Sequence, residues 1–145
     1  MKNVPSPQRS RNMAAIAGKN TRPELRLRSV VFARGLRYRL HVKGLPGSPD
    51  LVFPAYRAAV FVHGCFWHRH ACCRLTAVPK SNAPFWSQKF AVNVARDQST
   101  RAALLEQGWR VAIVWECGLK RSPEEIAARL ETWLRSPAST EIDIA

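Results

Sequence analysis

The sequence predicts an α/β fold, in which a central mixed or parallel sheet is flanked by helices. Residues 58–62 and 109–115 are almost wholly apolar, as is typical of strands buried at the centre of a sheet. A helical pattern lies between these two runs, and a strand, helix, strand order implies a crossover within one sheet. The chain of 145 residues has the length of one domain.

Residues 1–20 are predicted to form a basic arm, because they are rich in Lys, Arg, Ser, Asn and Pro and have little apolar periodicity. A helix is expected to follow this arm. Thr21 and Glu24 have the spacing of a capping box, which marks the beginning of the helix, and Gly35 marks its end. The apolar stripe of this helix is expected to comprise Leu25, Leu27, Ser29, Val31 and Phe32.

Short elements come next along the chain. Residues 36–42 alternate apolar and polar side chains, which predicts a half-buried strand, and the Gly- and Pro-rich residues 44–49 predict a turn. A strand, a turn and the first fully buried strand are then expected at residues 51–53, 54–56 and 58–62. Residues 64–88 have no clean period, so an irregular loop is predicted there.

The second half of the chain has clearer patterns. Apolar spacing from residue 85 to 107 predicts a long helix, which Gly108 ends before the buried strand at 109–115. Ser122 and Glu125 then form another capping box. The buried face of this last helix is expected to comprise Ile126, Leu130, Trp133 and Leu134.

We therefore expect three parts along the chain: the arm at residues 1–20, a folded domain at 21–135 and a loose tail at 136–145. No stretch approaches the ~20 consecutive apolar residues that a membrane span needs. The first residues also lack the apolar stretch of a signal peptide. A cytosolic protein is expected.

Charge gives the first indication of a partner. The chain carries 23 Lys and Arg against 10 Asp and Glu, a net charge of +13, and 17 of the cations are Arg. Residues 1–40 hold ten of these cations and a single acid, Glu24. Such an excess favours nucleic acid held by its phosphates over a solvated surface or a membrane-surface patch, which are the alternatives.

The cysteines and histidines predict a zinc site. Cys65, His70 and Cys72 lie within eight residues, and Cys117 stands after the last buried strand. Four ligands of these types close a tetrahedral site, which would order a loop that lacks a core of its own. A disulfide framework is not expected in a cytosolic chain.

The choice among these ligands stays open at two positions. Cys73 competes with Cys72, and His68 competes with His70, so a slip of one position is possible from spacing alone. The plainer alternative is four buried, reduced cysteines and an unrelated histidine.

A second group of residues predicts hydrolytic chemistry. Asp50 begins one strand and His63 ends the next, so a carboxylate and an imidazole can meet at one point. A carboxylate amid such positive charge can hold Mg²⁺ beside a phosphate, and His63 or His68 can take a proton from water. The alternative is an aspartate that caps a turn and histidines that are structural.

Aromatic residues form the third group. Phe66 and Trp67 lie between the proposed ligands, and Phe85 and Trp86 follow the loop. In a basic loop, flat side chains like these can wedge between stacked bases. Core packing is the alternative, which we assign instead to the tryptophans on periodic elements: Trp109, Trp115 and Trp133.

Together these segments resemble the very short patch repair (Vsr) endonucleases, which nick DNA at a T:G mismatch. The likeness runs from about Ser10 to Leu119, and the string from His63 to His68 and the pair Glu116 and Cys117 carry it most specifically. It implies a restriction-endonuclease-like fold, in which Phe-x-His, here residues 61–63, replaces the usual acidic-x-Lys element.

The resemblance also implies roles for single residues. Asp50 would hold the catalytic Mg²⁺ with the backbone carbonyl of Val62, and His68 would activate water, supported by His63 and Glu24. The implied structural zinc ligands are Cys65, His70, Cys72 and Cys117. The implied DNA-intercalating side chains are Phe66, Trp67 and Trp86.

The implied function is Mg²⁺-dependent nicking of one strand of double-stranded DNA, 5′ to the mismatched T. A monomer in the bacterial cytoplasm, associated with the nucleoid, is expected, with mismatch-repair proteins as further partners. Two alternatives are a nuclease of the same fold that cuts unmispaired DNA, and a non-catalytic zinc-containing DNA-binding module.

This chain departs from the family pattern at a few positions. Val62 stands where Thr is common, and Arg69 and Ala71 interrupt a run rich in histidine. The spacing from Cys72 to Pro79 is one residue longer than the pattern expects. None of these changes removes a proposed ligand.

Overall fold

The computed structural model describes residues 21–71, 73, 75–76 and 81–145. The predicted arm at residues 1–20 lies outside them. The described strands are β1 (Leu51–Phe53), β2 (Ala58–His63), β3 (Arg110–Trp115) and β4 (Glu141–Ile144). They form one sheet in the order β1-β2-β3-β4, in which β1 pairs antiparallel with β2 while β2–β3 and β3–β4 are parallel. The mixed sheet is as predicted.

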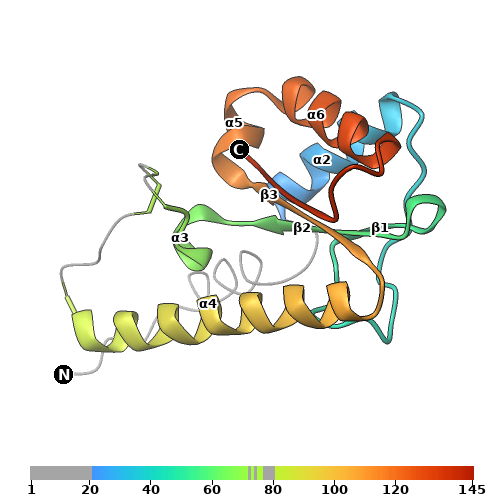
Figure 1. Cartoon of the computed structure of the whole chain (residues 1–145). Helices are drawn as coiled ribbons and strands as arrows, with labels where there is room; N and C mark the ends of the chain where they lie inside the picture. Colours follow the sequence, from blue (N-terminus) through green and yellow to red (C-terminus); the bar gives the residue numbers. More distant parts are fainter. Residues whose placement is uncertain (1–20, 72, 74, 77–80) are drawn as a thin grey trace.

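Helices cover both faces of this sheet (Figure 1). One face packs against α2 (Arg22–Ala33), α5 (Glu116–Arg121) and α6 (Pro123–Arg135), and the long α4 (Ala83–Glu106) runs across the other. None of the helices in the described residues is long and apolar enough to cross a membrane.

Alternation along the two central strands divides the core. Val60 and Ala112 belong to the larger cluster with helices α2, α5 and α6, whereas Phe61 and Ile113 belong to the smaller cluster beside α4. Successive strand residues point to opposite faces, so one run of apolar residues serves both layers. His63 follows Phe61 by two positions and therefore points toward α4.

The predicted helix ends are confirmed. The Thr21 hydroxyl accepts a hydrogen bond from the Glu24 N–H at 3.5 Å, and the Ser122 hydroxyl accepts one from the Glu125 N–H at 3.3 Å. Gly108, just after α4, has a φ of +84°, a left-handed conformation that glycine adopts without steric cost. The predicted buried face of α6 is buried as expected.

Part of the stripe predicted for α2 is wrong. Leu27 and Val31 are fully buried, but Leu25 and Phe32 are 49% and 57% exposed. At about 100° per residue, these two lie about 120° around the helix from the buried pair. The sheet and α6 cover only one side of α2, so the second half of the stripe faces outward.

Two further predictions need correction. Residues 36–42 form no strand: only Arg39 makes a bridge, with Val52, and His41 leaves the extended conformation at a φ of +55°. The predicted loop at residues 64–88 contains a short helix, α3 (Cys65–His68), and the first residues of α4. Its sequence lacks a helical period because α3 is a single turn.

The expected loose tail at residues 136–145 is also wrong, because β4 lies within it. The N–H of Val111 donates to the carbonyl of Thr140 at 2.9 Å, which begins the pairing with β3. Ile144 is fully buried in the larger core cluster. Four residues of mixed polarity at a sheet edge are too short a pattern to predict.

Ile144→Ala should therefore destabilise the protein by about 2–4 kcal/mol, because it leaves a cavity in the core. Ile142, which is only partly buried on the same strand, supplies the control, and Ile142→Ala should cost clearly less. Chemical denaturation of both variants measures the difference. Equal and small losses would mean that β4 contributes little to the fold.

Candidate active site and metal centre

The end of the β2–β3 pair brings the predicted site residues together. The parallel register pairs His63 with Trp115. Cys65 follows His63 by two residues, and Cys117 follows Trp115 by two residues. The backbone N–H of Cys117 donates to the sulfur of Cys65 at 3.4 Å. The histidine site and the cysteine cluster therefore occupy neighbouring positions at one end of the sheet.

Asp50 lies beside this end, next to a second carboxyl group. Its Oδ2 accepts a hydrogen bond of 2.6 Å from the N–H of Val62. Burial raises the pKa of Asp50 to about 7; the Val62 hydrogen bond opposes this shift, while the adjacent Glu24 carboxyl adds to it. Glu24 reaches the site from α2 and pairs there with Arg28 at 3.2 Å. The structure thus brings together Asp50 and Glu24, two of the residues that the resemblance implied for the site.

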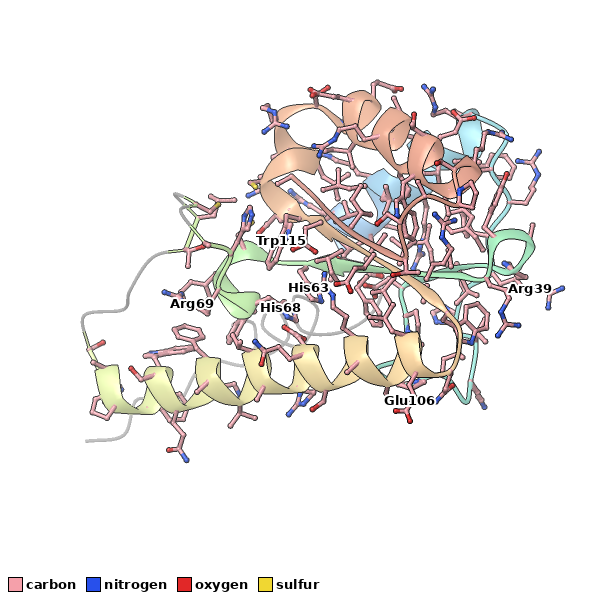
Figure 2. The ribbon with its side chains drawn as sticks, in the orientation of Figure 1. Arg39, His63, His68, Arg69, Glu106 and Trp115 are labelled. Atoms are coloured by element: carbon pink, nitrogen blue, oxygen red, sulfur yellow. The ribbon has the colours of Figure 1, made fainter. Side chains whose placement is uncertain are left out.

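The two predicted histidines form a stacked pair. The ring centroids of His63 and His68 lie 3.8 Å apart at an interplanar angle of 7°. Figure 2 shows both rings between the sheet and α4. Burial, followed by the charge of His68, lowers the pKa of His63 to about 3, so His63 is neutral at physiological pH. A positive charge on His68 would lower the pKa of Asp50, so the two groups are close enough to interact electrostatically.

Asp97 of α4 connects the pair, and the sequence analysis missed it. Its Oδ2 lies 2.6 Å from Nδ1 of His68, and its Oδ1 lies 3.9 Å from Nε2 of His63. An ionised carboxylate only accepts hydrogen bonds, so Nδ1 of His68 is the donor in this pair, and in the neutral ring Nε2 would carry the lone pair.

A signal for Asp97 was present in the sequence. The two buried residues of α4 are Phe90 and Leu104, and Asp97 lies midway between them in steps of seven. Seven residues are close to two helical turns, so the three side chains share the face turned to the sheet. An acid in the middle of a buried stripe indicates a buried partner.

The second cluster has the composition of a zinc site. Among the described residues, ligand atoms of Cys65, His70, Cys73 and Cys117 all lie within 4.8 Å of one another. Nδ1 of His70 is 3.6 Å from the sulfur of Cys65 and 3.5 Å from that of Cys117. Tetrahedral zinc, with Zn–S near 2.3 Å and Zn–N near 2.0–2.1 Å, requires an S···N separation of about 3.6 Å.

The third cysteine of the cluster, among the described residues, is Cys73. The spacing of the sequence allowed this residue as the competitor of Cys72. Cys72 lies outside the described residues, so its role stays a prediction.

The thiols differ in their environments. Burial raises the pKa of Cys65 to about 12 and also raises the pKa of Cys117. Desolvation acts the same way on Cys73, but hydrogen bonds from the Leu75 backbone and from the other two thiols outweigh it and lower the pKa. A bound cation would deprotonate all three, since coordinated thiols lose their protons outright.

The predicted intercalating residues lie together beside these clusters. The Phe66 ring centroid is 5.2 Å from that of Trp67 and 5.7 Å from that of Trp86, and all three side chains are half-buried. Phe90 packs on the same group at 5.2 Å from Phe66. None of the three predicted residues belongs to either core cluster.

Arg69 adds a cation to this aromatic group. It ends α3 in a left-handed conformation, with a φ of +54°. Its guanidinium carbon lies 4.1 Å from the Phe90 centroid and 5.6 Å from that of Phe66, within the range of cation–π attraction. Figure 2 shows Arg69 at the outer end of α3.

Comparison with known proteins identifies the family. The family model described as DNA mismatch endonuclease Vsr matches residues 3–74. The DNA mismatch endonuclease Vsr of Escherichia coli (strain K12) is 46% identical over 140 residues, which cover 93% of this chain and 89% of that protein. The chain belongs to the Vsr family.

Two nicking enzymes that are also similar to this chain support the family assignment. The type II nicking enzyme V.XorIIP of Xanthomonas oryzae pv. oryzae is 54% identical over 79% of this chain and 84% of its own length. The type II nicking enzyme V.NmeAIP of Neisseria meningitidis is 42% identical over 78% of this chain and 80% of its own length. The predicted family and the restriction-endonuclease-like fold class are confirmed.

Because the pKa of Asp50 is raised, replacing this residue with a neutral one should stabilise the fold by an amount that depends on pH. The folded Vsr protein binds the Asp50 proton more tightly than the unfolded chain, so this residue weakens the fold as pH rises from about 4 to about 7. At pH 8 without metal, Asp50→Asn should raise Tm by about 3–6 °C, and the gain should shrink at pH 5.

Thermal unfolding of both proteins at the two pH values checks this. Asp143→Asn is the control, because that carboxylate is exposed and pairs with Arg101. It should give no gain at pH 8. An Asp50→Asn protein no more stable than wild type at pH 8 would contradict the raised pKa.

Proposed function

We propose that this protein is a Mg²⁺-dependent DNA mismatch endonuclease that nicks one strand at a T:G mismatch, as in very short patch repair. The observation that carries the proposal is the meeting of Asp50 and Glu24 with the stacked pair His63 and His68 at one end of the sheet. Membership of the Vsr family supports the same chemistry.

The carboxyl pair suits a divalent cation. Burial raises the pKa of Asp50, and repulsion from the adjacent Glu24 carboxyl adds to the shift, so the ionised pair is costly without a cation. Carboxylate oxygens are the ligands that Mg²⁺ prefers. We infer that Asp50 and the backbone carbonyl of Val62 would hold Mg²⁺, with Glu24 in support. When bound, Mg²⁺ supplies charge neutralisation at the phosphate and the leaving oxygen.

His68 is the proposed general base. With Nδ1 held by Asp97, Nε2 can accept a proton from the water that attacks the phosphodiester in line. His63, neutral and stacked on His68, limits rotation of that ring and adds no competing charge. Asp97 stabilises the imidazolium that forms, so it is proposed as a positioning residue.

The DNA contact is proposed to have two components. The net charge of +13 favours binding of the phosphates, whatever the base sequence. Phe66, Trp67 and Trp86 are proposed to enter the duplex beside the mismatch, where unstacking is cheapest. Action on the nucleoid and contact with mismatch-repair proteins follow as further proposals.

Nicking of a T:G duplex tests the proposed function against a T:A duplex of the same sequence. The wild-type protein with Mg²⁺ should nick one strand of the T:G duplex only. Asp50→Ala should reduce the rate on the order of a thousand-fold while binding is largely kept. Cutting of both strands of the T:A control would favour the nuclease for unmispaired DNA. No cleavage on any mismatch would favour a non-catalytic module.

We also propose that the cysteine cluster holds structural zinc through Cys65, His70, Cys117 and one of Cys72 and Cys73. Cys73 is favoured because it meets the other three. Cys73→Ser should therefore release zinc and lower Tm, while Cys72→Ser should retain one zinc per chain. Metal analysis and thermal unfolding of the two variants decide between the neighbours, and the opposite result would return the role to Cys72.

If Trp67 enters the duplex beside the mismatch, its removal should reduce the discrimination between T:G and T:A DNA. Trp67→Ala should weaken binding of T:G DNA on the order of ten-fold, with a smaller effect on T:A DNA, because one stacking platform is lost. Phe32→Ala removes an exposed aromatic ring on α2 and is the control. Titration of both duplexes measures this, and equal losses on the two would mean that Trp67 is structural.

A further inference from the structure

Four aromatic rings form a continuous column between the cysteine cluster and the histidine pair. His70 stacks on Trp115, with centroids 4.2 Å apart and an interplanar angle of 9°. Trp115 meets His63 edge to face at 5.3 Å and 79°. His63 in turn stacks on His68. Figure 2 labels three of these rings, Trp115, His63 and His68, which lie one after another.

The backbone fixes the middle of this column and the position of His68. Trp115 and His63 are register partners at the ends of β3 and β2, so their side chains stand on the same face of the sheet. The N–H of Cys65 donates to the Glu116 carboxylate at 3.3 Å, which links the segments that follow β2 and β3. α3 then carries Cys65 at its first position and His68 at its last.

We propose that Trp115 is a positioning residue that couples the metal state of the cysteine cluster to the alignment of His63 and His68. The inference rests on the proposed function, since it concerns the histidines of that site. Trp115 lies between His70 of the cluster and His63. Its proposed role is to position the histidines and does not include contact with the substrate.

The geometry explains why a tryptophan serves here. Its indole is large enough to stack on His70 with one part and to meet the edge or face of His63 with another. Aromatic pairs in stacked and edge-to-face arrangements resist sliding, because their quadrupoles favour particular orientations. Coordination of His70 by zinc would hold the first ring of the column still, and each ring would then restrict the next.

Two substitutions test the role of the indole in the full-length protein. Trp115→Leu keeps apolar volume without a ring, and Trp115→Phe keeps a smaller ring. Trp109→Phe is the matched control, because Trp109 precedes the opposite end of β3 and lies under Arg57. Zinc content, kcat and KM on a T:G duplex, and the imidazole ¹H–¹⁵N NMR signals of His63 and His68 are measured for each protein.

Trp115→Leu should retain one zinc and a KM within about two-fold of wild type, while kcat falls at least ten-fold and both imidazole signals shift. Trp115→Phe should recover part of kcat, and Trp109→Phe should match wild type. Unchanged kcat and unchanged imidazole signals in Trp115→Leu would overturn the proposal. If Trp115→Leu does not fold, Trp115→Phe decides: wild-type kcat together with wild-type imidazole signals would overturn it.

Tryptophan fluorescence gives a readout that does not depend on nicking. Removal of zinc by a chelator in Mg²⁺-free buffer should change the emission of the wild-type protein, and most of that change should be absent in Trp115→Phe. The same change in both proteins would overturn the coupling. A wild-type protein that never nicks would refute the proposed function, yet the fluorescence and NMR results would still decide the role of Trp115.

Discussion

The parallel pairing of β2 with β3, in the register that sets His63 beside Trp115, is the constraint on which the rest of the site depends. Side chains alternate along both strands, so this register turns both residues toward α4. It also places Cys65 and Cys117 two residues beyond the pair, where their atoms meet. A slip of one residue would turn His63 to the opposite face and separate the cysteines.

The buried groups at this end of the sheet oppose stability. Asp50 lies beside Glu24 with a raised pKa, and His63 is kept neutral by burial. Selection for stability alone would replace or expose these groups. Their burial fits catalysis instead, because hydrolysis of a phosphodiester uses a carboxylate pair to hold a cation and an imidazole with a free lone pair. The cluster of Cys65, His70, Cys73 and Cys117 could hold a metal, and a bound metal would offset this cost by holding the two strand ends together.

Much of this arrangement was predictable, since its signals are local. Capping boxes at Thr21 and Ser122 and apolar periodicity gave α2, α4 and α6, apolar runs gave the central strands, and short spacings gave most of the two clusters. Contacts between distant segments were not predictable: β4 was missed because an edge strand takes its pairing from β3. Asp97 was missed although it lies on the inward face of α4, because the role of a single acid is defined only by the histidines it faces.

The central claim is that zinc bound by the cysteine cluster holds the ends of β2 and β3 together. X-ray absorption at the zinc edge of the purified protein tests it most directly, because the spectrum gives the number and type of atoms that coordinate the metal. One zinc per chain is expected, with three sulfur neighbours near 2.3 Å and one nitrogen near 2.0–2.1 Å. Protein without zinc, or zinc surrounded only by nitrogen and oxygen, would contradict the claim.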